Sequence, residues 1–298
     1  MGSAMLAELI ASWSLFQTSY LVGWCAAAAL AWVGIWVVAR NQIFLGAAVS
    51  QASALGIASA LGLASLSAFA THADEMSGGA ATALAVLAAV ATALFTARGS
   101  RPGRETPEAV TGWVFLLGAS VPVLLVAHSP HGLHEVERTL FSSVLGASRT
   151  DLALLAVVTV LLLLAVLFFR KRILLLSMDP EFAAAVGMRE ALWRNAAGVV
   201  LGVVVGLSMR ATGMLYTFGC LVLPALIAKN LGREFAPVFW KAPAIALTAA
   251  VAGFVLAHHF DTPPAQTTVA LLCALLALVW SGRLLRVRSA RATSMLSS

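Results

Sequence analysis

Charged residues are scarce in this sequence of 298 residues: they make up 11% of it, whereas 60% of the residues are hydrophobic. Because a typical soluble domain carries about 25% charged residues, the composition excludes an ordinary cytosolic globular enzyme. Cysteine is also rare, and Cys25, Cys220 and Cys273 all lie inside apolar stretches. Neither a disulfide framework nor a CxxC zinc site is therefore available. The composition indicates an integral membrane protein.

Motifs for ATP hydrolysis and for common hydrolases are absent as well. No GxxxxGK[ST] phosphate loop occurs, so the chain does not hydrolyse ATP by that mechanism on its own. There is no nucleophile elbow and no HExxH helix. None of the apolar runs carries a charge at its midpoint, where proton relays and ion-coupled carriers usually have one. We predict that the chain is not an enzyme and binds no cofactor of its own.

Nine apolar runs have a length suited to crossing a bilayer, for which a helix needs about 20 mostly apolar residues. We predict an all-α polytopic membrane protein with spans near residues 20–39, 47–70, 80–97, 109–127, 152–169, 195–209, 212–228, 242–257 and 266–282. The seventh run is the weakest because it is short and contains Gly213, Gly219 and Pro224. A broken helix there would leave eight full spans as the alternative.

The basic residues are distributed unevenly among the connections between these runs. When the sides alternate and the tail 283–298 is cytoplasmic, 16 of the 19 Lys and Arg residues are cytoplasmic. Lys and Arg collect in cytoplasmic loops of membrane proteins. We therefore predict an external N-terminal segment 1–19, a cytoplasmic loop 170–194 and a basic cytoplasmic tail 283–298.

No long linker or internal repeat divides the chain, so we predict a single membrane domain over residues 1–298. Within the sixth run, Gly198, Gly202 and Gly206 recur every four residues. Such a face lets another helix approach closely. Packing within the chain is the favoured interpretation, and a subunit interface is the alternative.

The loop 170–194 carries the signals of a short capped helix. Asp179 suits the N-cap, Pro180 the first helical position, and Glu181 complements the positive helix end. Gly187 suits the left-handed conformation that closes a helix. A fixed helix in this loop predicts a docking site, and a well-capped solvated connector is the alternative.

The same segment resembles the coupling region of the bacterial zinc and manganese type ABC permeases, which are related to the vitamin B12 permease fold. In that family a pattern close to D-P-E-x-A-x-x-x-G contacts the ATPase. Other family motifs are similar to stretches of this chain in the same order between residues 20 and 282. These stretches are 44–56 (FLGAAVSQASALG), 108–113 (EAVTGW), 140–146 (LFSSVLG) followed by 151–152, 212–225 and 260–264 (FDTPP).

The resemblance implies the permease subunit of an ATP-binding-cassette importer in the bacterial cytoplasmic (inner) membrane, which carries a transition-metal ion by alternating access. ATP and Mg would be bound by the partner ATPase. The implied partners are this cytoplasmic ATPase, a second permease subunit in a homodimer, an external solute-binding protein and the lipid bilayer, with no nucleic acid. The implied ATPase-coupling residues are Asp179, Pro180, Glu181, Phe182 and Gly187.

One departure from the family bears on the cargo. Where the family commonly has Asp and His in its second span, this chain has Ala47 and Gln51, so two good ligands for zinc or manganese are missing. Polar side chains in a small, apolar run favour the lining of a path over exposure to lipid. We predict a translocation path that includes Ser50, Gln51, Met214, Cys220 and Pro224. The alternative is that Gln51 only bonds a neighbouring helix.

All six histidines lie in predicted external connections, together with acidic residues. Because such nitrogen and oxygen ligands suit transition metals, we predict metal capture at an external mouth, with solvated loop histidines as the alternative. The candidate ligands are His128, His131, His134, Glu135 and Asp261. Soft ligation of copper(I) by Met209, Met214 and Cys220 is a further hypothesis, and gap-filling packing is its alternative.

Two other functions remain open from the sequence. The first is an ATP-independent carrier or channel in which the D-P-E loop is only structural. The second is a permease for a metal chelate or another small nutrient, which the residues Ala47 and Gln51 make plausible.

Overall fold

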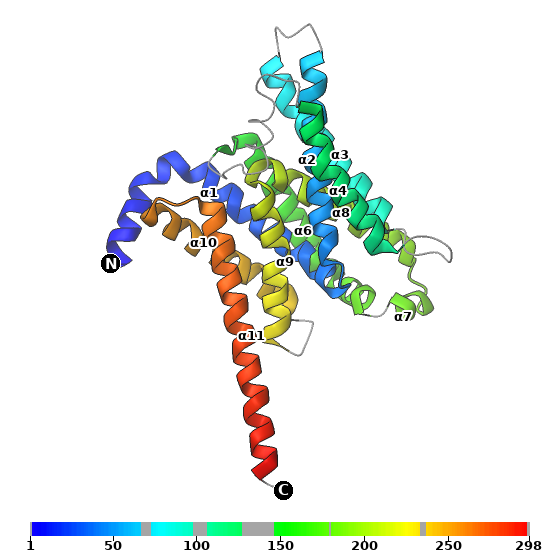
Figure 1. The fold of residues 1–298 in the computed structure, drawn as a ribbon, viewed down its shortest axis with the longest axis vertical. Helices are drawn as coiled ribbons and strands as arrows, with labels where there is room; N and C mark the ends of the chain where they lie inside the picture. The colour runs from blue at the N-terminus through cyan, green and yellow to red at the C-terminus, as the bar shows by residue number, and fades with distance from the viewer. Residues whose placement is uncertain are drawn as a thin grey trace.

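The computed structural model describes residues 2–66, 73–97, 106–126, 146–178, 180–232 and 237–296, which are helical apart from short connections (Figure 1). The helices are α1 (Gly2–Ala39), α2 (Ile43–Leu66), α3 (Ala73–Ala97), α4 (Pro107–Val126), α6 (Arg149–Met178), α7 (Pro180–Ala185), α8 (Glu190–Thr212), α9 (Met214–Leu231), α10 (Val238–Phe260) and α11 (Pro264–Leu296). No strand occurs in these ranges. The all-α prediction is confirmed.

Nine helices of the described ranges are long and apolar enough to cross a membrane, as predicted. These candidate spans are Phe16–Ala39, Ile43–Ala60, Gly79–Ala97, Glu108–Leu125, Arg149–Ser177, Glu190–Thr212, Met214–Leu231, Val238–Phe260 and Pro264–Arg283. The main differences from the predicted runs are at the ends. α6 continues through the basic triplet 170–172, because long cationic side chains can reach water from the end of an apolar helix. α1 includes most of the segment 1–19.

The seventh span is a full helix, as predicted, and not the broken helix that was the alternative. α9 is continuous from Met214 to Leu231 and passes through Pro224. Gly213 alone separates α8 from α9, and its φ of 79° lies in the left-handed region. A proline removes one backbone donor from a helix, whereas a left-handed residue stops the helical path altogether. The interruption therefore precedes the seventh span and does not divide it.

The described helices pack in two groups. In the first group α2 packs on α3 and α4, and α3 packs on α8. In the second, α1 packs on α6, α9 and α10, while α11 packs on α9 and α10. Figure 1 shows α2, α3 and α4 on one side of the molecule and α10 and α11 on the other. Contacts of α8 with α1, and of α2 with α9, join the two groups.

The glycine face of α8 is used for packing within the chain. A Cβ placed on Gly202 would lie 2.5 Å from the Cα of Val90, and one on Gly206 would lie 2.8 Å from the Cα of Val86. Both valines belong to α3, so the backbones of α8 and α3 approach each other where side chains are missing. The interpretation of this face as an intramolecular contact is confirmed.

α9 is fixed at the centre of the second group. A Cβ placed on Gly34 of α1 would lie 1.7 Å from the carbonyl oxygen of Leu221. Tyr216 is fully buried; its hydroxyl donates a hydrogen bond to the Gly23 carbonyl at 2.9 Å, and its ring meets Phe254 edge to face. A buried hydroxyl without a partner would cost about 1–3 kcal/mol. These contacts hold α9 between α1 and α10 and set the position of its first residues.

Much of the outer surface is apolar, most clearly along α6. Its exposed large apolar side chains are Leu154, Val157, Val160, Leu161, Leu164, Leu167, Phe168 and Phe169. A water-soluble protein rarely exposes so continuous an apolar surface. A helix whose backbone groups bond internally can instead present it to lipid.

Candidate functional site

Gln51 and Met214 meet where α2, α4 and α9 come together. The Gln51 amide Nε2 donates a hydrogen bond to the Met214 sulfur at 3.2 Å, and Gln51 is 8% exposed. Gly118 of α4 allows this arrangement, because a Cβ placed on it would lie 2.7 Å from the carbonyl carbon of Gln51. Met214 takes its position from the turn at Gly213 and from the buried α9. The structure therefore brings together two of the five predicted path residues.

The other predicted path residues lie apart from this pair. The Ser50 hydroxyl donates to the Gly46 carbonyl in its own helix at 2.9 Å, and Ser50 is fully buried. Cys220 and Pro224 are buried along α9, with Cys220 in the main hydrophobic core. A fully buried thiol among apolar side chains is typical of a packing residue. The path role of these residues stays a prediction.

Ala47 and Gln51 are one helical turn apart on α2, and both are buried. Residues at positions i and i+4 of a helix lie on the same face. The small Ala47 side chain and the amide of Gln51 thus occupy the face where the family commonly has Asp and His. A primary amide and a thioether form a neutral pair, which lacks the carboxylate and imidazole preferred by zinc and manganese.

A polar cavity of about 550 Å³ opens where α1 ends and α2 and α4 begin. Its lining combines ionisable and hydroxyl side chains with the first residues of α2. The polar lining residues are Arg40, Asn41, Gln42, Thr96, Thr106, Glu108 and Thr111. Because α2 begins in this lining and continues to Gln51, the cavity and the Gln51–Met214 pair lie along the same helix.

The short helix expected in the loop 170–194 is present as α7. Pro180 is its first residue, as predicted, and Gly187 has a φ of 82°. The Gly187 amide donates to Ala184 and the Met188 amide donates to Ala183, at 3.0 and 3.1 Å. These two bonds form a Schellman motif, which requires a left-handed residue at Gly187. The closing role predicted for Gly187 is confirmed; Asp179 lies outside the described residues.

α7 has one buried side and one exposed side. Ala183 is fully buried where α7 packs on α6 and α8, whereas Phe182 is 55% exposed and Val186 is also exposed. The side chain of Glu181 is not among those described. Exposed apolar side chains such as these form a surface that a protein partner can cover. Figure 1 shows α7 at the periphery of the molecule.

The proposed external metal site falls mostly outside the described residues: this applies to His128, His131, His134 and Glu135. Asp261 is described, and it is an exposed residue with a φ of 54° that caps the C-terminus of α10. In the described part of the chain, no group of three or more His, Cys, Asp or Glu residues could hold a metal ion. The capture site stays a prediction.

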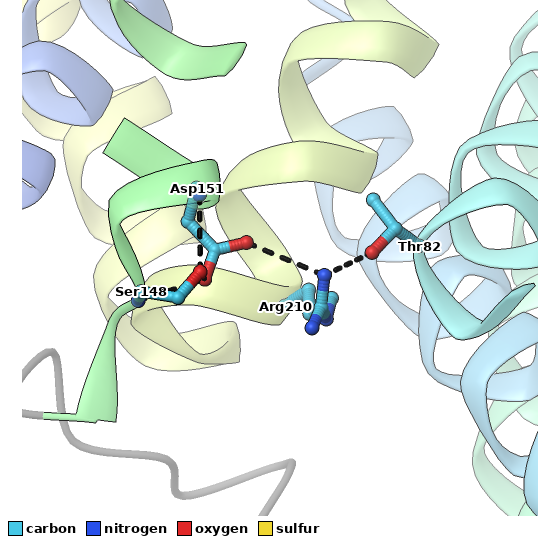
Figure 2. A network of polar contacts seen from close by, with 4 residues as sticks. All are labelled: Thr82, Ser148, Asp151 and Arg210. Carbon is cyan, nitrogen blue, oxygen red and sulfur yellow. Dashed lines mark hydrogen bonds and ion pairs between the residues drawn. The ribbon is translucent and has the colours of Figure 1, made fainter. Parts of the chain in front are cut away.

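A polar network that the sequence analysis did not anticipate joins α3, α6 and α8 (Figure 2). The Arg210 guanidinium contacts the Asp151 carboxylate at 3.3 Å and also donates to the hydroxyl of Thr82. Asp151 accepts further hydrogen bonds from the amide and hydroxyl of Ser148, at 3.0 and 2.7 Å. Arg210 is therefore anchored within the chain, and this contact between α6 and α8, with Thr82 on α3, bridges the two packing groups.

Part of this network has a signal in the sequence. Ser148 and Asp151 stand three residues apart before an apolar run, and the Asp151 amide donates back to the Ser148 hydroxyl at 3.1 Å. This reciprocal pattern is a capping box at the start of α6. The pairing with Arg210, 59 residues further along, has no comparable signal, because it depends on how α8 packs beside α6.

In the described residues, nine candidate spans, a short capped helix between two of them and a largely apolar surface define a polytopic α-helical membrane protein. The comparison with known families is more specific. The model of the ABC 3 transport family matches residues 12–282, and the chain belongs to this family. The family assignment made from the sequence motifs is confirmed.

Relatives and a solved structure agree with this family. The chain is 27% identical over 179 residues to the manganese transport system membrane protein MntB of Synechocystis, covering 60% of this chain and 58% of MntB. It is 23% identical over 248 residues to the manganese transport system membrane protein MntC of Halalkalibacterium halodurans, covering 83% of this chain and 80% of MntC. Over the first two curated relatives it spans 55% and 58% of their length.

The fold is similar to that of a chain in the structure of PsaBC from Streptococcus pneumoniae in complex with Fab. The TM-score is 0.74 at 18% sequence identity, and the match covers 92% of this chain and 95% of the other. At this identity the similarity establishes the shared fold. It extends over nearly all of the helical bundle described above.

Proposed function

We propose that the chain is the membrane-spanning permease subunit of an ATP-binding-cassette importer for a transition-metal ion. The observation that carries this proposal is the family match over residues 12–282, which includes the candidate spans and α7. The similarity to two manganese transport proteins supports a metal cargo. In this proposal a separate cytoplasmic ATPase binds ATP and Mg, and a second permease copy and an external solute-binding protein complete the transporter in the bacterial inner membrane.

α7 receives the motion of the ATPase in this proposal. Its closing motif fixes its length, and the buried Ala183 anchors it on α6 and α8. A displacement of α7 therefore acts on the ends of two spanning helices at once. The exposed Phe182 provides the apolar contact for the partner, of the kind that often dominates binding at an interface.

The cargo path in this proposal runs along α2. The Gln51–Met214 contact joins α2 and α9 beside Gly118 of α4, and the polar cavity at the start of α2 forms the cytoplasmic opening. Alternating access would then open and close the contact between α2 and α9. A neutral amide and thioether hold a divalent ion weakly, which suits passage more than storage.

The experiment reconstitutes the full chain in proteoliposomes with the cytoplasmic ATPase and the external solute-binding protein that the proposal requires. Uptake of manganese, zinc and iron is measured with and without ATP on the side of the membrane that carries the ATPase. We expect ATP-dependent uptake, and we expect Phe182→Lys to lower it about tenfold, as for the loss of one interface contact of about 1.4 kcal/mol. Leu192→Lys is the matched control, because Leu192 is an exposed apolar residue at the start of α8, outside α7.

Uptake that does not depend on ATP would contradict this proposal and favour a carrier or channel. Normal ATP-dependent uptake by the Phe182→Lys variant would place the coupling contact elsewhere. The metal-chelate alternative is supported by Ala47 and Gln51, which lack the usual metal ligands. Uptake of chelated metal in preference to the free ion, in the same vesicles, would favour that alternative.

A further inference from the structure

An apolar pocket of about 250 Å³ lies between α1, α6 and α8, with one wall from Phe239 of α10. Its lining residues differ from those of the polar cavity, and Arg40, which lines that cavity, lies over the ring of Trp36 between the two. Three tryptophans, Trp32, Trp36 and Trp193, line it together with aliphatic side chains. The walls offer no carboxylate, imidazole or thiolate, so a metal ion does not fit there.

Cationic side chains lie beside the aromatic residues of this pocket. The Arg172 guanidinium is 6.0 Å from the ring centres of Phe169 and Trp193. The Arg40 guanidinium is 5.1 Å from the ring centre of Trp36. Both are within the range of a cation–π interaction. The pocket thus has an apolar interior with guanidinium groups against its walls.

The positive charge near the pocket is only partly neutralised. Glu190 pairs with Arg194 at 2.7 Å, and both act electrostatically on Arg40. Burial lowers the pKa of Arg40; Glu190 acts to raise this pKa and Arg194 to lower it further. Arg40 also lines the polar cavity together with Glu108, so two carboxylates lie near Arg40 and Arg194, and Arg172 adds a third cation beside the apolar pocket. This excess of positive charge favours an anionic occupant.

One wall of the pocket also has an unsatisfied hydrogen-bond donor. The indole Nε1 of Trp36 is buried and has no acceptor among the described residues. The neighbouring Trp32 differs, because its Nε1 donates to the Phe239 carbonyl at 3.1 Å. Buried donors are normally paired with protein or ordered solvent, so the Trp36 donor is a polar group in an otherwise apolar wall.

We propose that this pocket binds an anionic phospholipid of the bilayer. One acyl chain lies between α1, α6 and α8, and the phosphate contacts Arg172. The order of groups from pocket to mouth, apolar then amphipathic then cationic, matches the order of groups in a phospholipid. The lipid would join the ends of α1, α6 and α8 beside α7.

The binding test uses the full chain in phosphatidylcholine nanodiscs that contain a small fraction of lipid with brominated acyl chains. The brominated lipid is either phosphatidylglycerol or phosphatidylcholine, and its quenching of tryptophan fluorescence is measured. We expect the affinity of the site for phosphatidylglycerol to be about fivefold higher than for phosphatidylcholine. This is the size of the attraction between one arginine and an anionic headgroup. Equal quenching by the two lipids would overturn the proposal.

Two variants test the headgroup and chain contacts separately. Arg172→Gln removes a cation at the mouth, and Ala165→Phe fills the pocket from its α6 wall; each should abolish the preference for phosphatidylglycerol. Their controls are Arg283→Gln on α11 and Ala153→Phe at an exposed position of α6. A preference retained in a folded Ala165→Phe variant would overturn occupancy of the pocket. If that variant does not fold, the comparison of Arg172→Gln with Arg283→Gln decides. An equal preference for phosphatidylglycerol in these two variants would overturn the proposal.

Discussion

Asp151 is held from two sides, by the capping box at the start of α6 and by Arg210 of α8. The two roles use different carboxylate oxygens, since Oδ2 accepts from Ser148 and Oδ1 contacts Arg210. The side chains of Arg210 and Asp151 are 29% and 11% exposed. Solvent thus reaches Arg210 more than Asp151, which weakens the ion pair relative to a fully buried one.

We expect Asp151→Asn to destabilise the protein by about 1–2 kcal/mol, because the substitution removes the charge that pairs with Arg210 and weakens the cap. The measurement is thermal unfolding of the purified chain in detergent. Asp261→Asn is the control, since Asp261 is an exposed residue without a described ion pair. The double variant Asp151→Asn with Arg210→Gln should recover part of the loss. Equal stability of the Asp151→Asn and Asp261→Asn variants would contradict a structural role for the pair.

At this scale the sequence predicts contacts that are local along the chain. The closing conformation of Gly187 and the first helical position of Pro180 follow from residues within one helical turn. The contact between Gln51 and Met214 joins residues 163 apart, and its geometry depends on the packing of α2 against α9. Polarity in an apolar run identified Gln51 as unusual, but only the structure provides its partner.

The contact of α8 with α3 depends on the absence of side chains. Gly202→Ala would place a Cβ against the backbone of Val90, so α3 and α8 must separate. We expect a loss of about 1–3 kcal/mol in stability, the usual range for added volume in a packed core. Gly112→Ala is the control: Gly112 lies in α4, and a Cβ there meets no atom within 4 Å.

Because alanine favours a helix more than glycine does, Gly112→Ala should be neutral or stabilising by up to about 1 kcal/mol. The difference between the two variants is read from their unfolding temperatures in the same detergent. A Gly202→Ala variant as stable as Gly112→Ala would mean that the close approach of α8 and α3 is not essential to the fold.

The spanning helices could be predicted because each of them is a continuous apolar run in the sequence, long enough to cross a bilayer. Their ends were less certain, as α6 shows by continuing to Met178 beyond the basic triplet. The position of the break between α8 and α9 was not predicted, because Gly213 and Pro224 both interrupt helices in principle. Only the backbone geometry distinguishes the left-handed Gly213 from a proline that the helix accommodates.

The arrangement of the whole molecule is harder to predict. Spans that are apolar on all sides lack the periodic face that indicates which side packs inward. The division into one group around α2, α3, α4 and α8 and another around α1 and α9 therefore has no clear sequence signal. The exception is the glycine face of α8. The spacing of its glycines predicted a close contact with another helix, but it did not indicate that this helix is α3.

Membrane sidedness is the property of the whole molecule that the cation distribution predicts. α11 provides a compact test, since Asp261 lies just before it and Arg283 lies near the end of its span, and both are exposed. We expect single cysteines at these positions, in a variant without Cys25, Cys220 and Cys273, to label from opposite faces of the membrane.

An impermeant thiol reagent added to intact cells should label position 261 and should label position 283 only after permeabilisation. The reason is that the part of α11 beyond its candidate span carries several arginines, which are retained in the cytoplasm. Cysteines at His131 and Arg101, outside the described residues, should behave like positions 261 and 283 respectively. Labelling of position 283 in intact cells would reverse the topology, and it would place α7 on the side of the membrane where no ATPase could reach it.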